Sequence, residues 1–467
     1  MSQYAAEDLR KSVRGPVLCP GEDGYEAARK VPNAMIDRKP AIIARCAGAA
    51  DVISCVRFAR EHNILVSIRG GGHSIAGQAV CDGGLMIDLS CMKGIRVDLQ
   101  QRTARAEPGL TLGEFDHETQ AFGLATALGT VSKTGIAGLT LGGGFGHLSS
   151  KYGLACDNLI AADVVTADGN LLKANASENQ DLFWGLRGGG GNFGIVTSFE
   201  YRLHEITTVI GGAVLYPATK AKEILPFYRE FAEASPDELV IQAGSMTMNG
   251  VPVFLVGGCY CGSPAEGEKL LKPLRTFGSP IADIFAPVSY IQMQSMFDPF
   301  FPPGRQTYVK ANFIKSLSDM AMDALAEFAG TSPSVHTFGP WVEHWHGAAT
   351  RVAVAETAFP HRQYPYNFSV WSNWVSSSET EANIKWSRAC WDAMRPFMAD
   401  GSYVNYLEGE GDPLARAAYG PNYDRLVAIK NKYDPTNLFR MNHNVKPTEL
   451  AATKTADAVG AVEAGTM

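Results

Sequence analysis

Residues 67–77 read Ser67-Ile68-Arg69-Gly70-Gly71-Gly72-His73-Ser74-Ile75-Ala76-Gly77, and no other stretch of the chain is as informative. Three consecutive glycines allow positive φ and let the backbone come close to a bulky partner. Successive backbone N–H groups in such a turn form a concave nest that suits a pyrophosphate. His73 follows the glycines, so its imidazole would meet the molecule that carries the phosphates. Taken alone, the stretch also fits a tight surface turn with an incidental histidine.

Two further glycine-rich segments follow, over residues 129–146 and 187–194. Three spaced glycines within residues 187–194 satisfy G-x-G-x-x-G. The residues before them, 181–186, look helical, and the residues after them, 195–199, look like a strand. A dinucleotide-binding turn needs a strand before it, a helix after it and an acidic residue about 20 positions later. We therefore reject a fold built on such a dinucleotide-binding turn. Three unrelated turns are the alternative, but a long anionic ligand that passes several backbones explains the three segments better.

Composition limits the class of protein. The chain has 467 residues, which predicts two or three domains of about 100–200 residues each. With 46% hydrophobic and 19% charged residues, it resembles an ordinary globular protein. The formal net charge of -7 provides no basic surface for nucleic acid or anionic lipid. No apolar run approaches the ~20 residues of a membrane span, and no secretory signal is visible.

The nine cysteines are odd in number and scattered along the chain. Without a secretory signal, they are expected to be reduced thiols of a cytoplasmic protein. Cys259 and Cys261 are the only close pair, and two ligands do not make a zinc site. The sequence therefore predicts no metal site.

The first half of the chain alternates helical and strand patterns. Helices are expected over residues 49–63, 111–122 and 181–186, and strands over residues 65–68, 85–89, 102–107, 159–166 and 195–203. Asp168-Gly169 has the composition of a hairpin turn. The resulting mixture favours an α+β fold for this half.

The second half has several strands in sequence, flanked by helices. Helices are expected over residues 220–234, 264–272, 318–330, 379–395 and 424–432, and strands over residues 241–248, 251–261, 335–346, 350–357 and 367–375. Asn249-Gly250 predicts a tight hairpin, Ser263 an N-cap with Pro264 in the first turn, and Ser378 with Glu381 a capping box. This order suggests an antiparallel sheet covered on one face by helices. The tail from Glu449 is expected to be loose.

Six segments of the sequence together resemble the FAD-linked oxidases of the berberine-bridge-enzyme-like type. These oxidases belong to the vanillyl-alcohol-oxidase superfamily, whose FAD-binding domain is of the PCMH type. The segments are Arg69–Ser74, Thr134–Gly146, Lys151–Asn158, Asp181–Val196, Tyr403–Tyr406 and Tyr433–Asn444. The resemblance extends from about residue 36 to residue 447 and keeps the order of the motifs.

The resemblance implies an α+β fold with a bipartite FAD-binding domain. Residues 1–205 would form its N-terminal part, and residues 419–467 its C-terminal part with the tail. Residues 206–418 would form an inserted substrate domain, whose antiparallel sheet covers the isoalloxazine ring.

The resemblance also implies that FAD is attached covalently through one histidine, His73. Many relatives have a second link through a cysteine, but Val131 stands at that position, and Cys156 lies in the wrong segment. A single link is typical of the hydroxynicotine-oxidase branch. His147 follows Gly-Phe-Gly where relatives commonly have an aromatic residue, and it is expected to pack beside the cofactor rather than to act in catalysis. The expected FAD contacts are Arg69, Gly70, Gly71, Gly72, His73, Ser74, Thr130, Val131, Thr134, Gly135, Gly138, Gly142, Gly143, Gly144, Gly146, Ile195, Val196, Tyr403, Asn405, Asn442 and Asn444.

Flavin accepts a hydride, while the protein orients the substrate and handles its proton. The resemblance places the base at Tyr406, as a tyrosine kept close to phenolate by neighbouring groups that lower its pKa. If residues 403–406 form a strand, Asn405 and Tyr406 point to opposite faces. Core packing with a satisfied hydroxyl is the alternative for Tyr406.

Relatives use an acidic or phenolic group near residues 364–374, so Tyr366 and Asn367 are the candidates for a second catalytic residue. Alternation would place Asn367, Ser369 and Trp371 on one face of a strand. His344 and His346 would share a face beside Glu343 and could line the substrate cleft.

The sequence therefore predicts an FAD-dependent oxidase of a small alcohol, phenol, amine or secondary metabolite, with molecular oxygen reduced to hydrogen peroxide. A dehydrogenase with another electron acceptor is the first alternative, because the residue near Thr134 that decides oxygen access cannot be read from the sequence. A non-catalytic flavin-binding protein is the second. The identity of the substrate and the oligomeric state are open.

Overall fold

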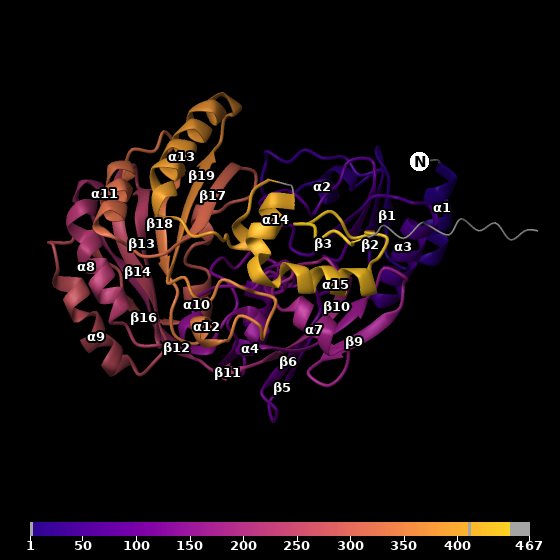
Figure 1. The fold of residues 1–467 in the computed structure, drawn as a ribbon, viewed down its shortest axis with the longest axis horizontal. Coiled ribbons are helices and arrows are strands. Elements are labelled where there is room, and N and C mark those ends of the chain that lie inside the picture. The colour runs from indigo at the N-terminus through magenta and orange to yellow at the C-terminus, as the bar shows by residue number, and fades with distance from the viewer. Residues whose placement is uncertain (1–2, 410–411, 449–467) are drawn as a thin grey trace, which may run out of the picture.

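The computed structural model describes residues 3–409 and 412–448, so the tail from Glu449 lies outside the described residues. Figure 1 shows two halves side by side. One half contains the sheets of the N-terminal residues, and the other contains a single large sheet. The C-terminal helices α14 (Asp412–Tyr419) and α15 (Tyr423–Tyr433), yellow in the figure, lie against the half formed by the N-terminal residues.

A four-stranded sheet in the order β1-β2-β4-β3 forms part of the N-terminal half. Its strands are β1 (Val17–Leu18), β2 (Ile42–Arg45), β3 (Val66–Arg69) and β4 (Leu85–Asp88), accompanied by α1 (Gln3–Ser12), α2 (Tyr25–Arg29) and α3 (Ala49–Glu61). Helix α3 buries Val52, Cys55, Val56 and Ala59, which recur at helical spacing. Because β3 ends at Arg69, the three glycines begin where this strand leaves the sheet.

A five-stranded antiparallel sheet in the order β5-β6-β10-β8-β9 completes the half. Its strands are β5 (Ile95–Asp98), β6 (Thr103–Ala106), β8 (Leu159–Val165), β9 (Leu171–Asn175) and β10 (Ile195–Arg202), with α4 (Leu112–Gln120), α5 (Ile136–Leu141) and α7 (Gln180–Leu186). Thr111 caps α4, and Glu114 completes the capping box. Leu426 and Ile429 of α15 are buried in the same core as this sheet.

The largest sheet has the strand order β15-β12-β14-β13-β18-β19-β17, with β16 paired to β12. Its strands are β12 (Thr208–Pro217), β13 (Leu239–Met248), β14 (Val251–Tyr260), β15 (Ala282–Asp283), β16 (Ala286–Ser289), β17 (Gln306–Ile314), β18 (Phe338–His344) and β19 (Tyr366–Trp374). Helices α8 (Ala221–Glu233), α9 (Pro264–Thr276), α11 (Asp319–Phe328) and α13 (Thr380–Met394) cover one face (Figure 1) and share its core. The predicted antiparallel sheet with one covered face is confirmed.

Local signals explain the elements that the sequence predicted well. Asn249 and Gly250 have φ of 51° and 78°, which is the geometry of a tight hairpin between β13 and β14. The Ser263 side chain accepts a hydrogen bond from the backbone N–H of Glu266, and Pro264 opens α9. Gly169, with φ of 77°, lies in the turn between β8 and β9.

Three local predictions are wrong. Residues 350–357 are not a strand: α12 (Ala348–Arg351) ends there, and the backbone that follows is held by side chains of the other half. The capping box before α13 consists of Ser376 and Glu379, because a 3₁₀ turn precedes the helix. Residues Val404–Tyr406 form a 3₁₀ helix closed by the Tyr406 N–H on the carbonyl of Tyr403, so the expected strand alternation does not apply.

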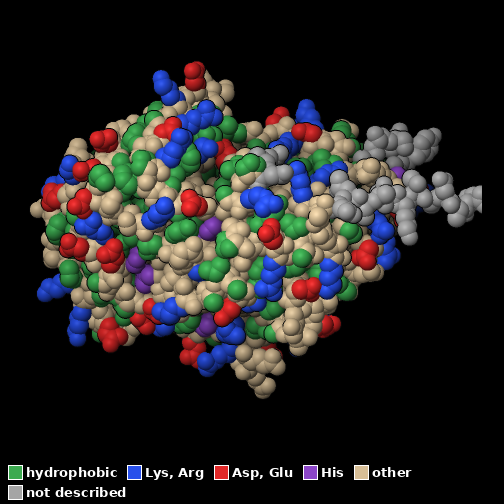
Figure 2. Space-filling view, viewed as in Figure 1, with side chains coloured by type: hydrophobic (Ala, Val, Ile, Leu, Met, Phe, Trp, Pro, Cys, Tyr) green, Lys and Arg blue, Asp and Glu red, His purple; other side chains and the backbone are tan. Residues whose placement is uncertain are grey.

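The remaining elements are short connections. They are β7 (Leu124–Ala125), which pairs with β11 (His204–Glu205), α6 (Ser149–Tyr152), α10 (Tyr290–Gln294), and the 3₁₀ helices η1 (Ala155–Asp157), η2 (Ala218–Lys220), η3 (Asp298–Phe300), η4 (Ser377–Glu379), η5 (Arg395–Phe397), η6 (Val404–Tyr406) and η7 (Gly420–Asn422). Within the described residues, no helix is both long and apolar enough to cross a bilayer. On the face shown in Figure 2, acidic and basic side chains are interspersed.

Candidate active site

A cavity of about 310 Å³ lies between the N-terminal half and the face of the large sheet that the helices leave uncovered. The glycine-rich loops and residues 403–407 form one side of it. Strands β13, β18 and β19, together with Phe297 and Phe301, form the other side. A largely apolar cavity with a few polar groups is the usual form of a small-molecule site.

Most positions expected to contact FAD line this cavity. They are Gly70, Gly71, Gly72, His73, Ser74, Thr130, Val131, Thr134, Gly135, Gly138, Gly142, Ile195, Val196, Tyr403, Asn405 and Asn442. The three glycine-rich segments, distant in sequence, therefore meet at one site, as predicted.

The backbone of these loops forms a cradle in which some positions admit only glycine. A Cβ atom on Gly71 would lie 2.5 Å from the Cα atom of Gly135, so the first two glycine loops cross in direct contact. A Cβ atom on Gly138 or Gly191 would meet nothing within 4 Å, so these glycines border open space. Gln78 also lines the cavity, and its Nε2 is buried without a partner among the described residues. A bare backbone with unused donors suits a long, polar cofactor such as FAD.

Gly143, Gly144 and Gly146 do not line the cavity, and their contact with the cofactor stays a prediction. Their lack of a side chain allows close packing within the protein instead. A Cβ atom on Gly143 would lie 2.9 Å from the ring of Phe359, and one on Gly144 would lie 2.5 Å from Ala155 Cβ. A Cβ atom on Gly146 would overlap backbone carbonyl oxygens.

Arg69 and Asn444 also lie outside the cavity lining. The Arg69 guanidinium turns away from the cavity and donates a hydrogen bond to the carbonyl of Ala28 in α2. Asn444 Oδ1 is buried without a partner among the described residues.

His73 projects into the cavity directly after the glycine turn and is half-buried. Desolvation by the surrounding protein lowers its pKa, so the imidazole is neutral at pH 7. A neutral imidazole has a nitrogen lone pair that is available for bond formation. The structure therefore presents His73 in the form that a covalent link would require.

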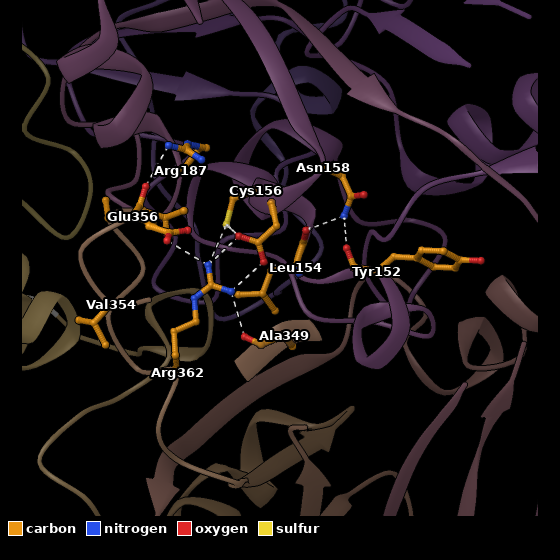
Figure 3. Close-up of polar contacts among 12 residues, drawn as sticks. Tyr152, Leu154, Cys156, Asn158, Arg187, Ala349, Val354, Glu356 and Arg362 are labelled. Atoms are coloured by element: carbon orange, nitrogen blue, oxygen red, sulfur yellow. Dashed lines mark hydrogen bonds and ion pairs between the residues drawn. The ribbon is translucent and has the colours of Figure 1, made fainter. Parts of the chain in front are cut away.

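Neither Cys156 nor His147 reaches the cavity. The Cys156 thiol is fully buried, and its sulfur lies 3.7 Å from Asp157 Oδ1. Arg362 lies beside it (Figure 3). His147 is also fully buried, its ring stacks 6.1 Å from that of Phe297, and burial lowers its pKa to about 4. Both side chains belong to the packing around the site.

Three neighbouring strands place polar side chains in one row on the face of the large sheet that the helices leave uncovered. Gln242 of β13 lies opposite Glu343 of β18, and Glu343 lies opposite Asn367 of β19. Gln242 and Glu343 line the cavity, and the Asn367 side chain donates a hydrogen bond of 3.0 Å to Glu343 Oε2. Asn367 therefore positions Glu343 and does not reach the cavity itself, which corrects its predicted role in catalysis.

Glu343 is the functional residue that the sequence prediction missed. Its carboxylate is buried and accepts hydrogen bonds from Tyr406 Oη at 3.0 Å, Asn367 Nδ2 at 3.0 Å and Trp345 Nε1 at 3.4 Å. Burial raises the pKa of Glu343, and the three donors oppose this shift. The sequence signal that could have identified Glu343 was a single acidic residue between two tryptophans, in a strand whose side chains alternate between two faces.

Tyr406 lines the cavity, but its predicted state as a near-phenolate is wrong. Burial and the adjacent Glu343 carboxylate raise the pKa of Tyr406 well above 10, whereas a phenolate needs nearby cations. The phenol is therefore protonated and donates to Glu343. The carboxylate is the basic member of the pair.

Tyr366 and His344 lie on the helix-covered side of the large sheet, which contradicts the predicted catalytic role of Tyr366 and the predicted place of His344 in the substrate cleft. His346, which stacks on His344, does not line the cavity either. The Tyr366 hydroxyl donates a hydrogen bond of 3.2 Å to Glu233 of α8. The ring of His344 stacks on that of His346 at 4.5 Å, and burial lowers the pKa of His344 to about 3. Alternation along β18 and β19 assigns His344 and Tyr366 to the face opposite Glu343.

A buried ion pair joins the two halves beside the site (Figure 3). Both terminal nitrogens of Arg362 lie 2.7 Å from the carboxylate oxygens of Asp157, and the Arg362 side chain is 2% exposed. Arg362 also donates to the carbonyl of Ala349 and the hydroxyl of Thr357. These bonds hold residues 349–362 against the N-terminal half.

Comparisons with known proteins agree with this geometry. A family model described as FAD binding domain matches residues 40–175, and one described as berberine and berberine like matches residues 402–446. A FAD-linked oxidoreductase of Dictyostelium discoideum is 32% identical over 445 residues, which are 94% of this chain and 96% of that protein.

Two solved structures share the fold over nearly the whole chain. 6-Hydroxy-D-nicotine oxidase from Arthrobacter nicotinovorans has a TM-score of 0.83 at 28% identity, covering 93% of this chain and 98% of its own. The carbohydrate oxidase from Microdochium nivale has a TM-score of 0.85 at 26% identity, covering 95% of this chain and all of its own, 100%. The α+β fold is thus that of the PCMH-type flavoproteins, and the chain belongs to the berberine-bridge-enzyme-like family of FAD-linked oxidoreductases.

Proposed function

We propose that the protein is an FAD-dependent oxidase that removes a hydride from a C–H bond next to oxygen or nitrogen in a small molecule. The two electrons pass to molecular oxygen, which becomes hydrogen peroxide. The observation that carries the proposal is the hydrogen-bonded pair of Tyr406 and Glu343, which lines the same cavity as the glycine cradle. Relatives named as nicotine and carbohydrate oxidases support the oxidase over the dehydrogenase.

The cofactor would lie along the glycine cradle. When bound, FAD supplies the acceptor for the hydride. The backbone of residues 70–74 and 134–142 would border its phosphates and ring, and Ile195, Val196 and Asn442 would complete the walls. The chain would then be organised as an FAD-binding domain from residues 1–205 and 419–467, with residues 206–418 as the substrate domain.

Tyr406 and Glu343 handle the substrate proton. A substrate hydroxyl or amine donates to the Tyr406 oxygen, while the Tyr406 proton is already directed at Glu343. As the C–H bond breaks, the substrate proton moves to the Tyr406 oxygen and the phenol proton moves to Glu343. The tyrosine thus returns to its protonated state, and the carboxylate holds the proton.

We further propose a single covalent link between an imidazole nitrogen of His73 and a ring methyl carbon of FAD. The imidazole loses its N–H hydrogen and the methyl group loses one hydrogen. The two electrons released pass to molecular oxygen, which becomes hydrogen peroxide. Val131 offers no second nucleophile, which leaves His73 as the single link.

The test is anaerobic mixing of the yellow protein with a panel of small alcohols and amines. We expect the flavin absorbance to bleach with at least one member, and air to restore the colour within seconds while hydrogen peroxide accumulates. A colour restored only by quinones would identify a dehydrogenase. A protein that bleaches with no candidate would be a flavin-binding protein without turnover.

A further inference from the structure

Five aromatic side chains line the end of the cavity at the large sheet: Phe297, Phe301, Phe338, Trp341 and Trp371, here called the aromatic box. The ring of Phe338 lies 4.2 Å from that of Trp341 and 5.7 Å from that of Phe301. Phe301 lies 5.8 Å from Trp371, and Trp371 lies 5.0 Å from Tyr406. The box therefore extends from the sheet to the phenol that would receive the substrate proton.

The polar atoms of the box are already used within the protein. Trp341 Nε1 donates to Gln242 Oε1 at 3.2 Å, and Trp371 Nε1 donates to Ser369 Oγ at 3.1 Å. A ligand in the box thus meets ring faces and ring edges rather than free N–H donors. Such surfaces favour flat, unsaturated ligands, which stack on them or meet them edge to face.

The charged side chains that line the cavity also limit which ligands can bind. Among the described residues that line the cavity, Glu343 is the sole carboxylate, and neither lysine nor arginine is present. An anionic ligand would therefore be buried beside Glu343 without a counter-charge, which is strongly unfavourable. A polyol would bury several hydroxyls, although Gln242, Glu343 and Tyr406 are the polar side chains at this end.

The box is closed by a strap, defined here as residues 295–305. Within it, Asp298 accepts hydrogen bonds from the backbone N–H and the hydroxyl of Ser132, on the opposite side of the cavity. Gly304 N–H also donates to the carbonyl of Pro32 at 3.0 Å. These bonds hold Phe297 and Phe301 over the cavity, so a ligand in the box lies against these two rings.

We propose that the substrate is a small aromatic alcohol or amine without an anionic group. Its ring lies in the aromatic box, and its hydroxyl or amine meets Tyr406. This inference rests on the proposed function. For an aryl alcohol, the carbinol C–H leaves as hydride, the O–H proton passes through Tyr406 to Glu343, and oxygen takes up two electrons and two protons. The balance is aryl alcohol plus oxygen to aryl aldehyde plus hydrogen peroxide.

The experiment measures binding of non-oxidisable probes to the flavin-loaded protein by calorimetry. The probes are benzamide, cyclohexanecarboxamide, benzoate and methyl β-cellobioside. We expect benzamide to bind about two- to tenfold more tightly than cyclohexanecarboxamide, as ring stacking predicts. Benzoate and the cellobioside are expected to bind at least about tenfold more weakly than benzamide.

Trp371→Leu and Phe301→Leu should each abolish the preference for benzamide over cyclohexanecarboxamide. Phe122→Leu is the matched control, because Phe122 is 53% exposed and does not line the cavity. Flavin content and circular dichroism verify folding, and either leucine variant suffices if the other does not fold. The proposal is overturned if benzoate or the cellobioside binds more tightly than benzamide, or if the folded variants keep the parent preference.

Binding and turnover separate the two proposals. Benzyl alcohol and benzylamine are then offered anaerobically, and bleaching by either supports the substrate class and identifies the polar group. An intact benzamide preference without bleaching by any alcohol or amine would refute the oxidase and leave an aromatic-binding site. Bleaching by sugars with no benzamide preference would refute the substrate class and leave the oxidase.

Discussion

Glu343 is subject to two opposing influences, and their balance sets the pH at which the site works. Burial raises the pKa of its carboxyl group, while hydrogen bonds from Asn367, Tyr406 and Trp345 lower it. A base must be deprotonated to act, so the rate of flavin reduction should rise as the pH passes upward through the pKa of Glu343.

Asn367→Ala tests this balance. Removing the amide donor takes away an interaction that favours the carboxylate, so the pKa of Glu343 rises and the acid limb of the rate moves to higher pH. Glu343→Gln should lower the rate of flavin reduction by about 10²–10⁴ and remove the limb. The measurement is stopped-flow flavin reduction against pH.

Asn373→Ala is the control, because Asn373 is a buried asparagine of the same strand whose Oδ1 accepts a hydrogen bond from Thr307 instead. Its pH profile should match that of the parent. An Asn367→Ala profile that overlays the parent, with an acid limb surviving in Glu343→Gln, would show that another group is the base.

His73 carries a second prediction about a single side chain. Acid-precipitated parent protein should keep the yellow flavin in the pellet, and His73→Ala should release it into the supernatant. His443→Ala is the matched control, because His443 is the other imidazole that lines the cavity. The measurement is flavin fluorescence of pellet and supernatant. Flavin freed from the parent, or from the His443 variant alone, would exclude the link at His73.

The sequence predicted the residues of the cradle better than those of the catalytic pair. Glycines that border a ligand lie in dense local motifs, so Gly70–Gly72 and Gly135–Gly142 could be located from the chain alone. Glu343 could not, because its role depends on register with Gln242 and Asn367 on two other strands. Tyr406 was found through the family motif, but its protonation state depends on that same distant carboxylate.

At the scale of elements, the strap over residues 295–305 depends on one latch between Asp298 and Ser132. Hydrogen bonds to a carboxylate contribute about 1.5–3 kcal/mol. Asp298→Asn weakens the latch at constant size, so Phe297 and Phe301 become less well ordered over the cavity. We expect benzamide to bind about five- to tenfold more weakly, with flavin content unchanged; calorimetry measures the binding.

Ser295→Ala is the control for the strap, because Ser295 donates only to carbonyls of the adjacent helix turn and is exposed. It should bind benzamide like the parent. If Asp298→Asn binds benzamide with unchanged affinity, the latch does not order the aromatic box. If it loses flavin instead, the latch supports the cofactor loop at Ser132 rather than the strap.

Elements with a local signal were predicted within a few residues, and elements fixed by distant contacts were not. The dipeptide Asn249-Gly250 by itself favours a hairpin turn, and Ser263-Pro264 by itself favours the start of a helix. Residues 403–406 form a turn because the Asn405 side chain donates to the carbonyl of Leu139, 266 positions away. No local pattern in the sequence encodes such a contact.

At the scale of the whole molecule, two buried ion pairs take part in contacts between chain segments that are far apart in sequence. Lys430 pairs with Asp434, four residues later, and both are fully buried. Lys430 also donates to the carbonyl of Asn192, which brings α15 against the third glycine loop. Arg362 and Asp157 join residues 349–362 to the N-terminal half. The site lies between the parts that these pairs connect, so its shape depends on both.

Asp157→Asn tests the ion pair between Arg362 and Asp157. The substitution leaves the Arg362 guanidinium buried without its counter-charge, which costs about 3–5 kcal/mol of stability. Asp237→Asn is the control, because Asp237 forms a similar two-pronged pair with Arg351 at the surface, where the side chains are 39% and 59% exposed. Loss of a surface pair costs at most about 1 kcal/mol.

Thermal unfolding followed by flavin fluorescence distinguishes the two variants. We expect Asp157→Asn to lower the midpoint by several degrees more than Asp237→Asn. Asp157→Leu combined with Arg362→Met should recover part of the loss, because apolar side chains can replace a buried ion pair. Equal midpoints for the buried and surface variants would mean that the halves are held together by the apolar contacts around Phe359 and Phe145, and that the ion pair only orients them.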